Sequence, residues 1–213
     1  MNRLKIEGLT KIIKGNTVLD NIDLELCGGK IYGLVGKNGS GKTMLIRSIA
    51  GLMKPTEGHI LYDQKELYSD IDMIPNLGLV IENIGLYPEF TGFKNLKMLA
   101  NIRKIINDEQ IKEIMRSVCL DHDDPRKVRK YSLGMRQKLV LAQAFMENPD
   151  VILLDEPTNA LDEKATSAVH DLCRNAAKRN AIVVIASHNK EDISQLCDQR
   201  FIITNGQCQI AEG

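Results

Sequence analysis

The sequence predicts an α/β fold with a mostly parallel sheet, an N-terminal antiparallel β subdomain and an α-helical insertion. Three observations lead to this prediction. Near the N-terminus, apolar and polar residues alternate, which is the pattern of half-buried antiparallel strands. Two unbroken apolar runs, 151–154 and 181–186, flank a stretch with the period of a helix, which is the order of a parallel βαβ unit. Between 91 and 118 the apolar residues recur every three or four positions, as in helices.

The antiparallel strands are expected at residues 4–7 and 18–26, because the alternation has a period of two there. Gly28 and Gly29 then turn the chain into a buried strand at 31–35. Two further strands are predicted along the chain, at 59–62 and 77–81.

The helical insertion accounts for the middle of the chain. Its second half has the i, i+3, i+4, i+7 spacing, at Ile111, Ile114, Met115 and Val118. A helix over 133–146 follows and ends before Asn148-Pro149, and another is expected over 163–179. We therefore expect one domain over 1–213, divided into a core with the antiparallel β subdomain (1–87 and 148–213) and a helical subdomain (88–147).

A complete phosphate-binding loop lies between the buried strand 31–35 and the helical stretch 44–50. Glycines allow successive backbone N–H groups to surround an anion, and the helix that follows presents unpaired N–H groups and the positive end of its dipole. Lys42 can reach the β- and γ-phosphates, and the Thr43 hydroxyl can bind the accompanying Mg²⁺. We expect a phosphate-loop NTPase core. The loop residues are Gly36, Lys37, Asn38, Gly39, Ser40, Gly41, Lys42 and Thr43.

Two carboxylates, Asp155 and Glu156, directly follow the apolar run 151–154. They are expected at the carboxyl end of a central parallel strand, which is where open α/β sheets bind ligands. Asp155 is predicted to hold the hydration shell of Mg²⁺. Glu156 is predicted to orient and deprotonate the water that attacks the γ-phosphate.

Composition limits the cellular compartment and the classes of binding partner that we expect. Lys and Arg total 28, as do Asp and Glu, so there is no global basic field and a nucleic acid partner is not expected. The five cysteines form no C-x-x-C pair, which fits a reducing compartment. Because the longest strictly apolar run is 181–186 and a membrane-spanning helix needs about 20 residues, only another subunit could hold the protein at a membrane.

Five elements together resemble the ATP-binding subunit of an ABC transporter: the phosphate loop, 131–137, 151–158, 160–162 and His188. The resemblance implies that ATP, with Mg²⁺, is hydrolysed in a head-to-tail dimer. Each ATP would lie between the phosphate loop of one subunit and the Ser132 and Gly134 segment of the other. By the same resemblance Asp162 would meet the opposite subunit. His188 would contact the γ-phosphate and hold the attacking water, so that Lys42, Glu156 and His188 form the catalytic set.

The resemblance also implies the partners and the location. The partners would be a polytopic membrane subunit and a second ATP-binding subunit that is identical or related. The protein would lie at the cytoplasmic face of the cell membrane. Glu82 and the segment 85–92 are similar to the bacterial subfamily that serves antimicrobial-peptide, bacitracin-type and other ABC-2 exporters. Export is therefore the expected direction, and the transported substrate depends on the membrane partner.

Three departures from the family pattern affect particular roles. Leu133 replaces the first glycine of the Ser-Gly-Gly-Gln segment, and Met135 replaces its glutamine. Glu82 stands where the family usually has a glutamine that contacts Mg²⁺, and its carboxylate can still serve as a metal ligand. Ile13 occupies the place of an aromatic residue that stacks on adenine, and it can offer only apolar contact.

Two other functions remain open. A soluble ABC ATPase that works on DNA or ribosomes would share these motifs, although such proteins usually carry a long coiled coil or a second nucleotide-binding domain. A GTPase is suggested by Asn189-Lys190-Glu191-Asp192, which matches a guanine-reading motif after a strand. Against a GTPase, Thr158 stands three positions after Asp155, where that class has glycine.

Overall fold

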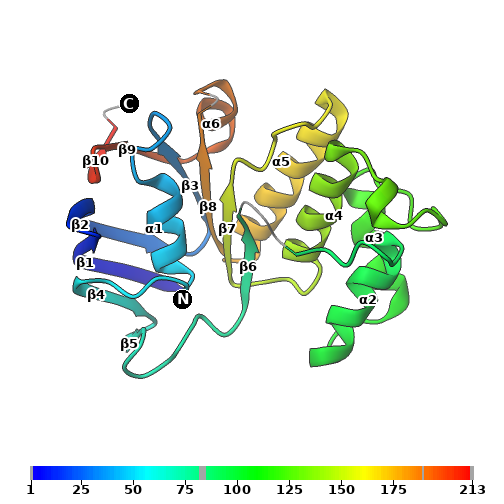
Figure 1. The fold of residues 1–213 in the computed structure, drawn as a ribbon, viewed down its shortest axis with the longest axis horizontal. Coiled ribbons are helices and arrows are strands. Elements are labelled where there is room, and N and C mark those ends of the chain that lie inside the picture. Colours follow the sequence, from blue (N-terminus) through cyan, green and yellow to red (C-terminus); the bar gives the residue numbers. More distant parts are fainter. Residues whose placement is uncertain (1, 82–84, 189, 212–213) are drawn as a thin grey trace.

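The computed structural model describes residues 2–81, 85–188 and 190–211. Two sheets and a group of helices make up the fold, with the antiparallel strands at one end and the helices α2 to α4 at the other (Figure 1). The predicted α/β class is confirmed, including the mostly parallel sheet, the antiparallel sheet near the N-terminus and the helical insertion.

The antiparallel sheet has the strand order β2-β1-β4-β5. Its first two strands form one long hairpin whose turn residues, Lys14 and Gly15, both have positive φ (50° and 82°), as a tight hairpin turn requires. The strands are longer than the residue alternation predicted, because pairing continues through register shifts to the hairpin tip. Their bounds are β1 (Arg3–Ile13), β2 (Asn16–Cys27), β4 (Glu57–Tyr62) and β5 (Lys65–Glu66).

The second sheet has the strand order β10-β9-β3-β8-β7-β6. All of its pairings are parallel except that of β10 with β9. Strands β9 and β10, which extend the sheet beyond β3, were not predicted from the sequence. The bounds are β3 (Lys30–Val35), β6 (Leu77–Val80), β7 (Val151–Asp155), β8 (Ile182–Ser187), β9 (Gln199–Thr204) and β10 (Gln207–Ile210).

Polar caps fix where several helices begin. The Thr91 hydroxyl accepts the Lys94 N–H at the start of α2, and Asn107 and Gln110 form a reciprocal capping box at α3. The helices α2 to α4 lie within the predicted insertion. Helix bounds are α1 (Lys42–Ile49), α2 (Gly92–Arg103), α3 (Asp108–Ser117), α4 (Leu133–Phe145), α5 (Glu163–Lys178) and α6 (Lys190–Leu196), with a 3₁₀ turn η1 (Val128–Lys130).

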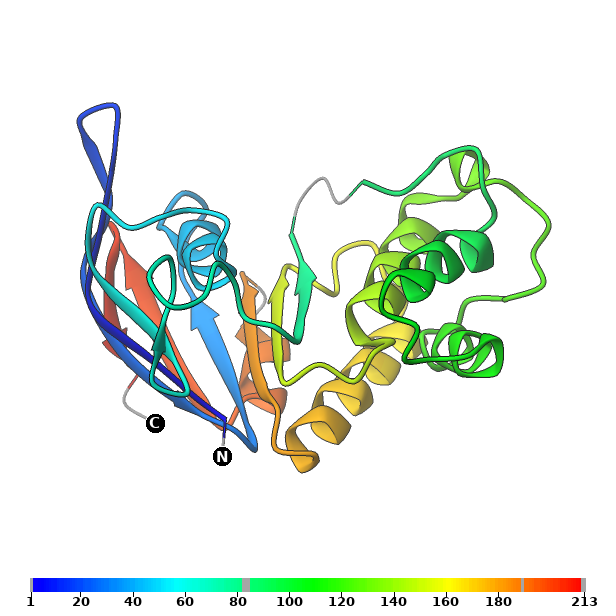
Figure 2. The ribbon, with the colours of Figure 1, turned by 90° about the horizontal axis from the view of Figure 1, so that it is seen from below.

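The parallel sheet separates two hydrophobic cores. Seen from below, α1 and the antiparallel sheet lie on one side of the parallel sheet, and α4 and α5 lie on the other (Figure 2). Residues of β7 alternate between them: Ile152 and Leu154 pack in the core on the side of α4 and α5, whereas Val151 and Leu153 pack in the core with α1 and the antiparallel sheet. Because both faces of β7 are covered, the strand is apolar at every position before Asp155.

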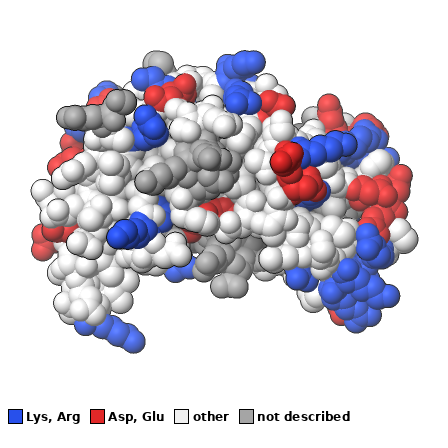
Figure 3. All heavy atoms as spheres, turned by 90° about the horizontal axis from the view of Figure 1, so that it is seen from above, with Lys and Arg blue, Asp and Glu red and all other residues white. Residues whose placement is uncertain are grey.

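The surface carries charges of both signs. Seen from above, Lys and Arg side chains gather at the helical end of the molecule with Asp and Glu side chains beside them (Figure 3). The ion pairs of this subdomain include those of Lys127 and Arg129 with Glu89. Over the described ranges, no helix has the length and apolar character needed to cross a membrane.

Candidate active site

The phosphate loop connects β3 to α1, and its glycines are required by close backbone approach. A Cβ on Gly36 would lie 2.4 Å from the Ile203 carbonyl oxygen and 2.5 Å from Ser40 Oγ. Gly41 is the N-cap of α1 with a φ of 116°, which side chains rarely allow. Its cap position has no side-chain hydrogen bond. The N–H groups that begin α1 are therefore placed to bind an anion.

Two polar side chains of the loop fit a polyphosphate. Lys42 is 6% exposed, and its Nζ donates to the carbonyl oxygens of Gly36 at 2.6 Å and Lys37 at 3.2 Å, so the ammonium lies across the loop. Ser40 Oγ is buried without a hydrogen-bond partner within the described chain. Because an unpaired buried hydroxyl is costly, a bound phosphate oxygen would offer it a partner.

The Thr43 hydroxyl and Asp155 meet where the first turn of α1 approaches the end of β7. Thr43 Oγ1 donates to Asp155 Oδ2 at 2.6 Å, and Asp155 is 7% exposed. The sequence placed both residues at a metal site, and the structure brings them together. A hydroxyl and a carboxylate are oxygen ligands of the kind that Mg²⁺ prefers, so this pair fits the ion.

Glu156 and His188 form a second pair at the carboxyl ends of β7 and β8. Glu156 has a φ of 48°, and its N–H donates to the Ala186 carbonyl at 2.8 Å, which holds the strained turn in place. Its carboxylate accepts the His188 N–H at 3.0 Å and the Ser187 hydroxyl at 3.3 Å. His188 Nδ1 lies 2.8 Å from Glu156 Oε2. A carboxylate and an imidazole are thus held side by side at the sheet edge.

These residues line one cleft of about 840 Å³. Ile13 is absent from the lining that the described residues form, and it is 37% exposed on the β1–β2 hairpin. Sequence reasoning missed seven lining residues, of which four come from the start of β2 and the β9–β10 turn. The seven are Thr17, Val18, Asn205, Gly206, Met44, Arg47 and Asn159. Among the predicted residues, the lining includes Asn38, Gly39, Ser40, Gly41, Lys42, Thr43, Asp155, Glu156 and His188.

Ser132 and Gly134 are absent from the cleft lining that the described residues form. Ser132 is the N-cap of α4, where its hydroxyl accepts the Met135 N–H at 3.2 Å. A Cβ on Gly134 would lie 2.6 Å from the Ala160 carbonyl oxygen. The glycine is therefore required by packing within the subunit, whatever it contacts in an assembly.

The turn after Glu156 is tied to α4 by two polar contacts. Gln137 Nε2 donates to the Pro157 carbonyl at 3.0 Å, and Lys138 Nζ lies 3.1 Å from Asp162 Oδ2. Asp162 is also the N-cap of α5 and accepts the Ala165 N–H at 2.8 Å. The Ala165 N–H and then the Lys138 ammonium lower the pKa of Asp162. The metal contact predicted for Glu82 and the guanine-reading motif that begins at Asn189 cannot be placed, because both residues fall outside the described residues.

Comparison with known proteins gives the family. Residues 19–159 match the family model described as ABC transporter. The chain belongs to the ABC transporter family. A Bacillus subtilis (strain 168) relative, named uncharacterized ABC transporter ATP-binding protein YybJ, is 47% identical over 98% of this chain and 96% of its own length.

Two further matches extend the ABC transporter assignment. The bacitracin transport ATP-binding protein BcrA of Bacillus licheniformis is 35% identical, over 96% of this chain and 67% of that protein. A solved ATP binding subunit of an ABC transporter superposes with a TM-score of 0.89 at 25% identity, covering 99% of this chain and 89% of that one.

The family fixes the chemistry of the chain. An ABC transporter ATP-binding subunit is an ATPase, so this chain binds ATP and hydrolyses it to ADP and phosphate. The comparisons support a transporter subunit over a soluble ABC machine and over a GTPase. The similarity of 189–192 to a guanine-reading motif is therefore a chance match.

Proposed function

We propose that this chain powers an ABC exporter by hydrolysing ATP in a site that two ATP-binding subunits share. One observation carries the proposal. The cleft gathers the phosphate-loop residues 38–43, the Thr43–Asp155 pair and the Glu156–His188 pair, whereas the turn at Ser132 lies outside it. A second subunit, packed head to tail, would bring its own α4 N-terminus to the open side of the cleft.

Within the cleft, different residues of this chain bind the phosphates, bind the metal and take part in proton transfer. The loop N–H groups and Lys42 bind the β- and γ-phosphates. Thr43 and Asp155 would hold Mg²⁺, which when bound would neutralise charge on the phosphate oxygens. Glu156 takes a proton from the attacking water. His188, held by Glu156 at 2.8 Å, orients that water and contacts the γ-phosphate.

Contact with the base is assigned to a different residue from the one that sequence reasoning chose. Ile13 is the last residue of β1 and pairs with Asn16 across the hairpin tip. Val18 lines the cleft beside Thr17 and offers an apolar surface there. We therefore assign the apolar contact with adenine to Val18.

The facing subunit contributes the remaining groups. Ser132 offers a hydroxyl, and the first turn of α4 offers N–H groups and the positive end of a dipole, which together suit the γ-phosphate. Asp162, 63% exposed at its side chain, is placed to meet that subunit. The second subunit is a copy of this chain or a related ATP-binding chain.

Export is proposed from the bacitracin transport relative together with the segment 85–92. The membrane partner would be polytopic, and the chain would lie on the cytoplasmic face of the membrane. The experiment is affinity purification of the tagged chain from detergent-solubilised membranes. We expect a polytopic membrane protein to co-purify in a fixed ratio. Recovery only with ribosomes or DNA would contradict the proposal and favour a soluble machine.

A further inference from the structure

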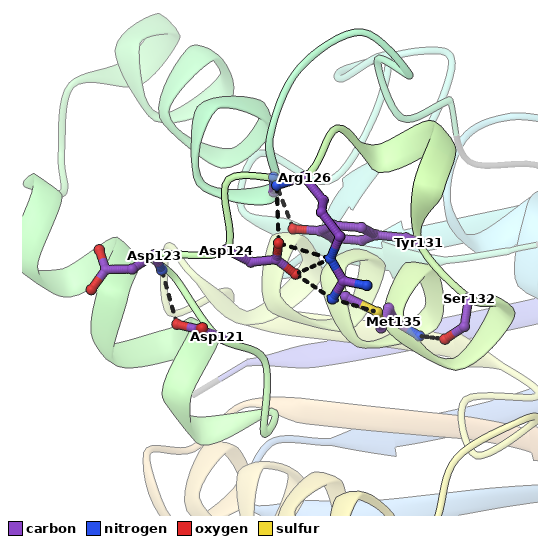
Figure 4. A network of polar contacts seen from close by, with 8 residues as sticks. Asp121, Asp123, Asp124, Arg126, Tyr131, Ser132 and Met135 are labelled. Carbon is purple, nitrogen blue, oxygen red and sulfur yellow. Dashed lines mark hydrogen bonds and ion pairs between the residues drawn. The ribbon is translucent and has the colours of Figure 1, made fainter.

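A run of polar contacts connects the loop after α3 to the first turn of α4 (Figure 4). It passes from Asp124 to Arg126, from Arg126 to Met135 and from Met135 to Ser132. Met135 stands where the family resemblance places a glutamine. The run therefore ends at the residue that the proposed function assigns to the phosphate of the facing subunit.

Arg126 is hydrogen-bonded at several atoms to Asp124, which is 8% exposed. Arg126 Nε lies 3.0 Å from Asp124 Oδ1 and 3.1 Å from Oδ2, and Nη2 donates to Oδ2 at 2.6 Å. The Arg126 backbone N–H donates to Oδ1 at 2.9 Å. These hydrogen bonds hold the pKa of Asp124 below its usual value. Because a planar guanidinium forks against a carboxylate, one orientation of Arg126 is strongly favoured.

From that anchored position, Arg126 reaches α4. Its Nη2 lies 3.7 Å from Met135 Sδ, which is a weak acceptor. The Met135 side chain also packs against the core on the helical side. The Met135 N–H in turn donates to Ser132 Oγ at 3.2 Å. The first turn of α4 is thus fixed through the side chain of Met135 as well as through its backbone.

The residue before Ser132 is fixed as well. Tyr131 is 3% exposed, and its hydroxyl accepts the Gly92 N–H at 3.2 Å. Since Ser132 Oγ accepts a hydrogen bond from within its own helix turn, its O–H proton can be directed outward to a phosphate oxygen. The arrangement sets up Ser132 as a donor before any ligand arrives.

We propose that Arg126 is a positioning residue for Ser132, acting through Met135. The inference rests on the proposed function, in which Ser132 binds the γ-phosphate held by the facing subunit. It also gives the Met135 departure a role, because a thioether held by Arg126 stiffens the turn that the family glutamine would otherwise occupy. Arg126 touches neither ATP nor the attacking water in this account.

The test measures ATP-driven pairing of subunits. Glu156→Gln provides the parent background, because slow hydrolysis lets the ATP-bound pair accumulate. Arg126→Lys keeps a cation beside Asp124. However, a single ammonium cannot make two hydrogen bonds to the carboxylate and also contact Met135. Met135→Leu removes the sulfur acceptor and leaves the Asp124–Arg126 contact intact, so it decides the matter should Arg126→Lys fold poorly. The matched control is Arg129→Lys, since Arg129 pairs with Glu89.

Analytical ultracentrifugation with saturating ATP gives the dissociation constant of the pair. We expect Arg126→Lys and Met135→Leu each to raise it about 3- to 10-fold, the range that corresponds to the loss of one net hydrogen bond. Arg129→Lys should stay within about 2-fold of the parent. Affinity of the isolated subunit for a fluorescent ATP analogue and the melting temperature should be unchanged, which a general loss of structure would not allow.

A double-mutant cycle separates this inference from the proposed function. With Ser132→Ala already present, Arg126→Lys should change pairing by less than about 2-fold, because the two residues act on one contact. Two results would overturn the role of Arg126 and leave the shared site standing. One is that the effects of Ser132→Ala and Arg126→Lys on the dissociation constant multiply. The other is that Arg126→Lys and Met135→Leu both leave that constant near the parent value. If Ser132→Ala itself left pairing unchanged, the shared site and the inference would both fail.

Discussion

The Glu156→Gln variant separates proton removal from the structural contacts of this side chain. In the wild type, the carboxylate accepts the His188 N–H at 3.0 Å and the Ser187 hydroxyl at 3.3 Å. A glutamine has the same shape but only one acceptor oxygen, so it can keep the hydrogen bond from the His188 N–H, while its NH₂ group would donate to the Ser187 hydroxyl instead of accepting from it. The amide cannot take a proton from water, so the chemical step should suffer most.

The expected magnitude follows from these contacts. Loss of a general base costs about 10²- to 10⁴-fold in turnover, or about 2.7–5.4 kcal/mol at 1.36 kcal/mol per tenfold change. His188 Nδ1, 2.8 Å from Glu156 Oε2, loses its charged partner at the same time, so at least the lower figure should be reached. ATP affinity should stay within about 3-fold, because Lys42 and Thr43 keep their own contacts with the loop and with Asp155.

The assay follows phosphate release at saturating ATP and Mg²⁺, beside titration with a fluorescent ATP analogue. Glu163→Gln is the matched control, since Glu163 is an exposed carboxylate in the first turn of α5 and the charge change is the same. It should retain nearly full turnover. If Glu156→Gln hydrolysed ATP within a few-fold of wild type while binding it normally, another group must remove the proton and our assignment would be refuted.

Three further predictions test other parts of the structure. Lys42→Ala should weaken ATP binding by about 1.5–3 kcal/mol, as expected for a hydrogen bond to a charged group, and calorimetry showing unchanged affinity would contradict this. Gly134→Ala should lower the free energy of unfolding in urea by about 1–3 kcal/mol, because the new Cβ would lie 2.6 Å from the Ala160 carbonyl oxygen and this strain outweighs the usual gain in helix propensity. A more stable variant would show that the turn at Ala160 can move to make room. Partial burial raises the pKa of Cys197 and of Cys208 to about 12, so at pH 8 both half-buried thiols stay protonated. Iodoacetamide should label them much more slowly in the native protein than after unfolding, and equal rates in the two states would contradict the raised pKa values.

The sequence predicted those parts of the site that are written as contiguous patterns. The loop 36–43 and the pair Asp155-Glu156 each lie at a strand end, and the chemistry of each can be judged from neighbouring residues alone. The buried strands β7 and β8 were predicted within about one residue, because apolar side chains on both faces leave an unbroken run. Local patterns were sufficient wherever the chain itself brings the residues together.

Contacts between residues far apart in the chain could not be predicted from the sequence. Strand β9 pairs with β3, which is far earlier in the chain, and its buried and exposed positions alternate too briefly to predict that neighbour. The β9–β10 turn then lines the cleft with Asn205 and Gly206. The contact of Ile13 with the base stays a prediction from resemblance, and the hairpin places Ile13 at its tip, outside the cleft lining that the described residues form. These outcomes depend on strand pairing and hairpin length, which no single motif encodes.

The shared site can be tested directly by measuring the ATPase rate per subunit as the subunit is diluted. We predict that the rate per subunit falls on dilution as pairs dissociate, and that Ser132→Ala abolishes the concentration-dependent activity while the single subunit still binds ATP. A rate per subunit that stays constant down to strictly monomeric protein, unaffected by Ser132→Ala, would contradict the account.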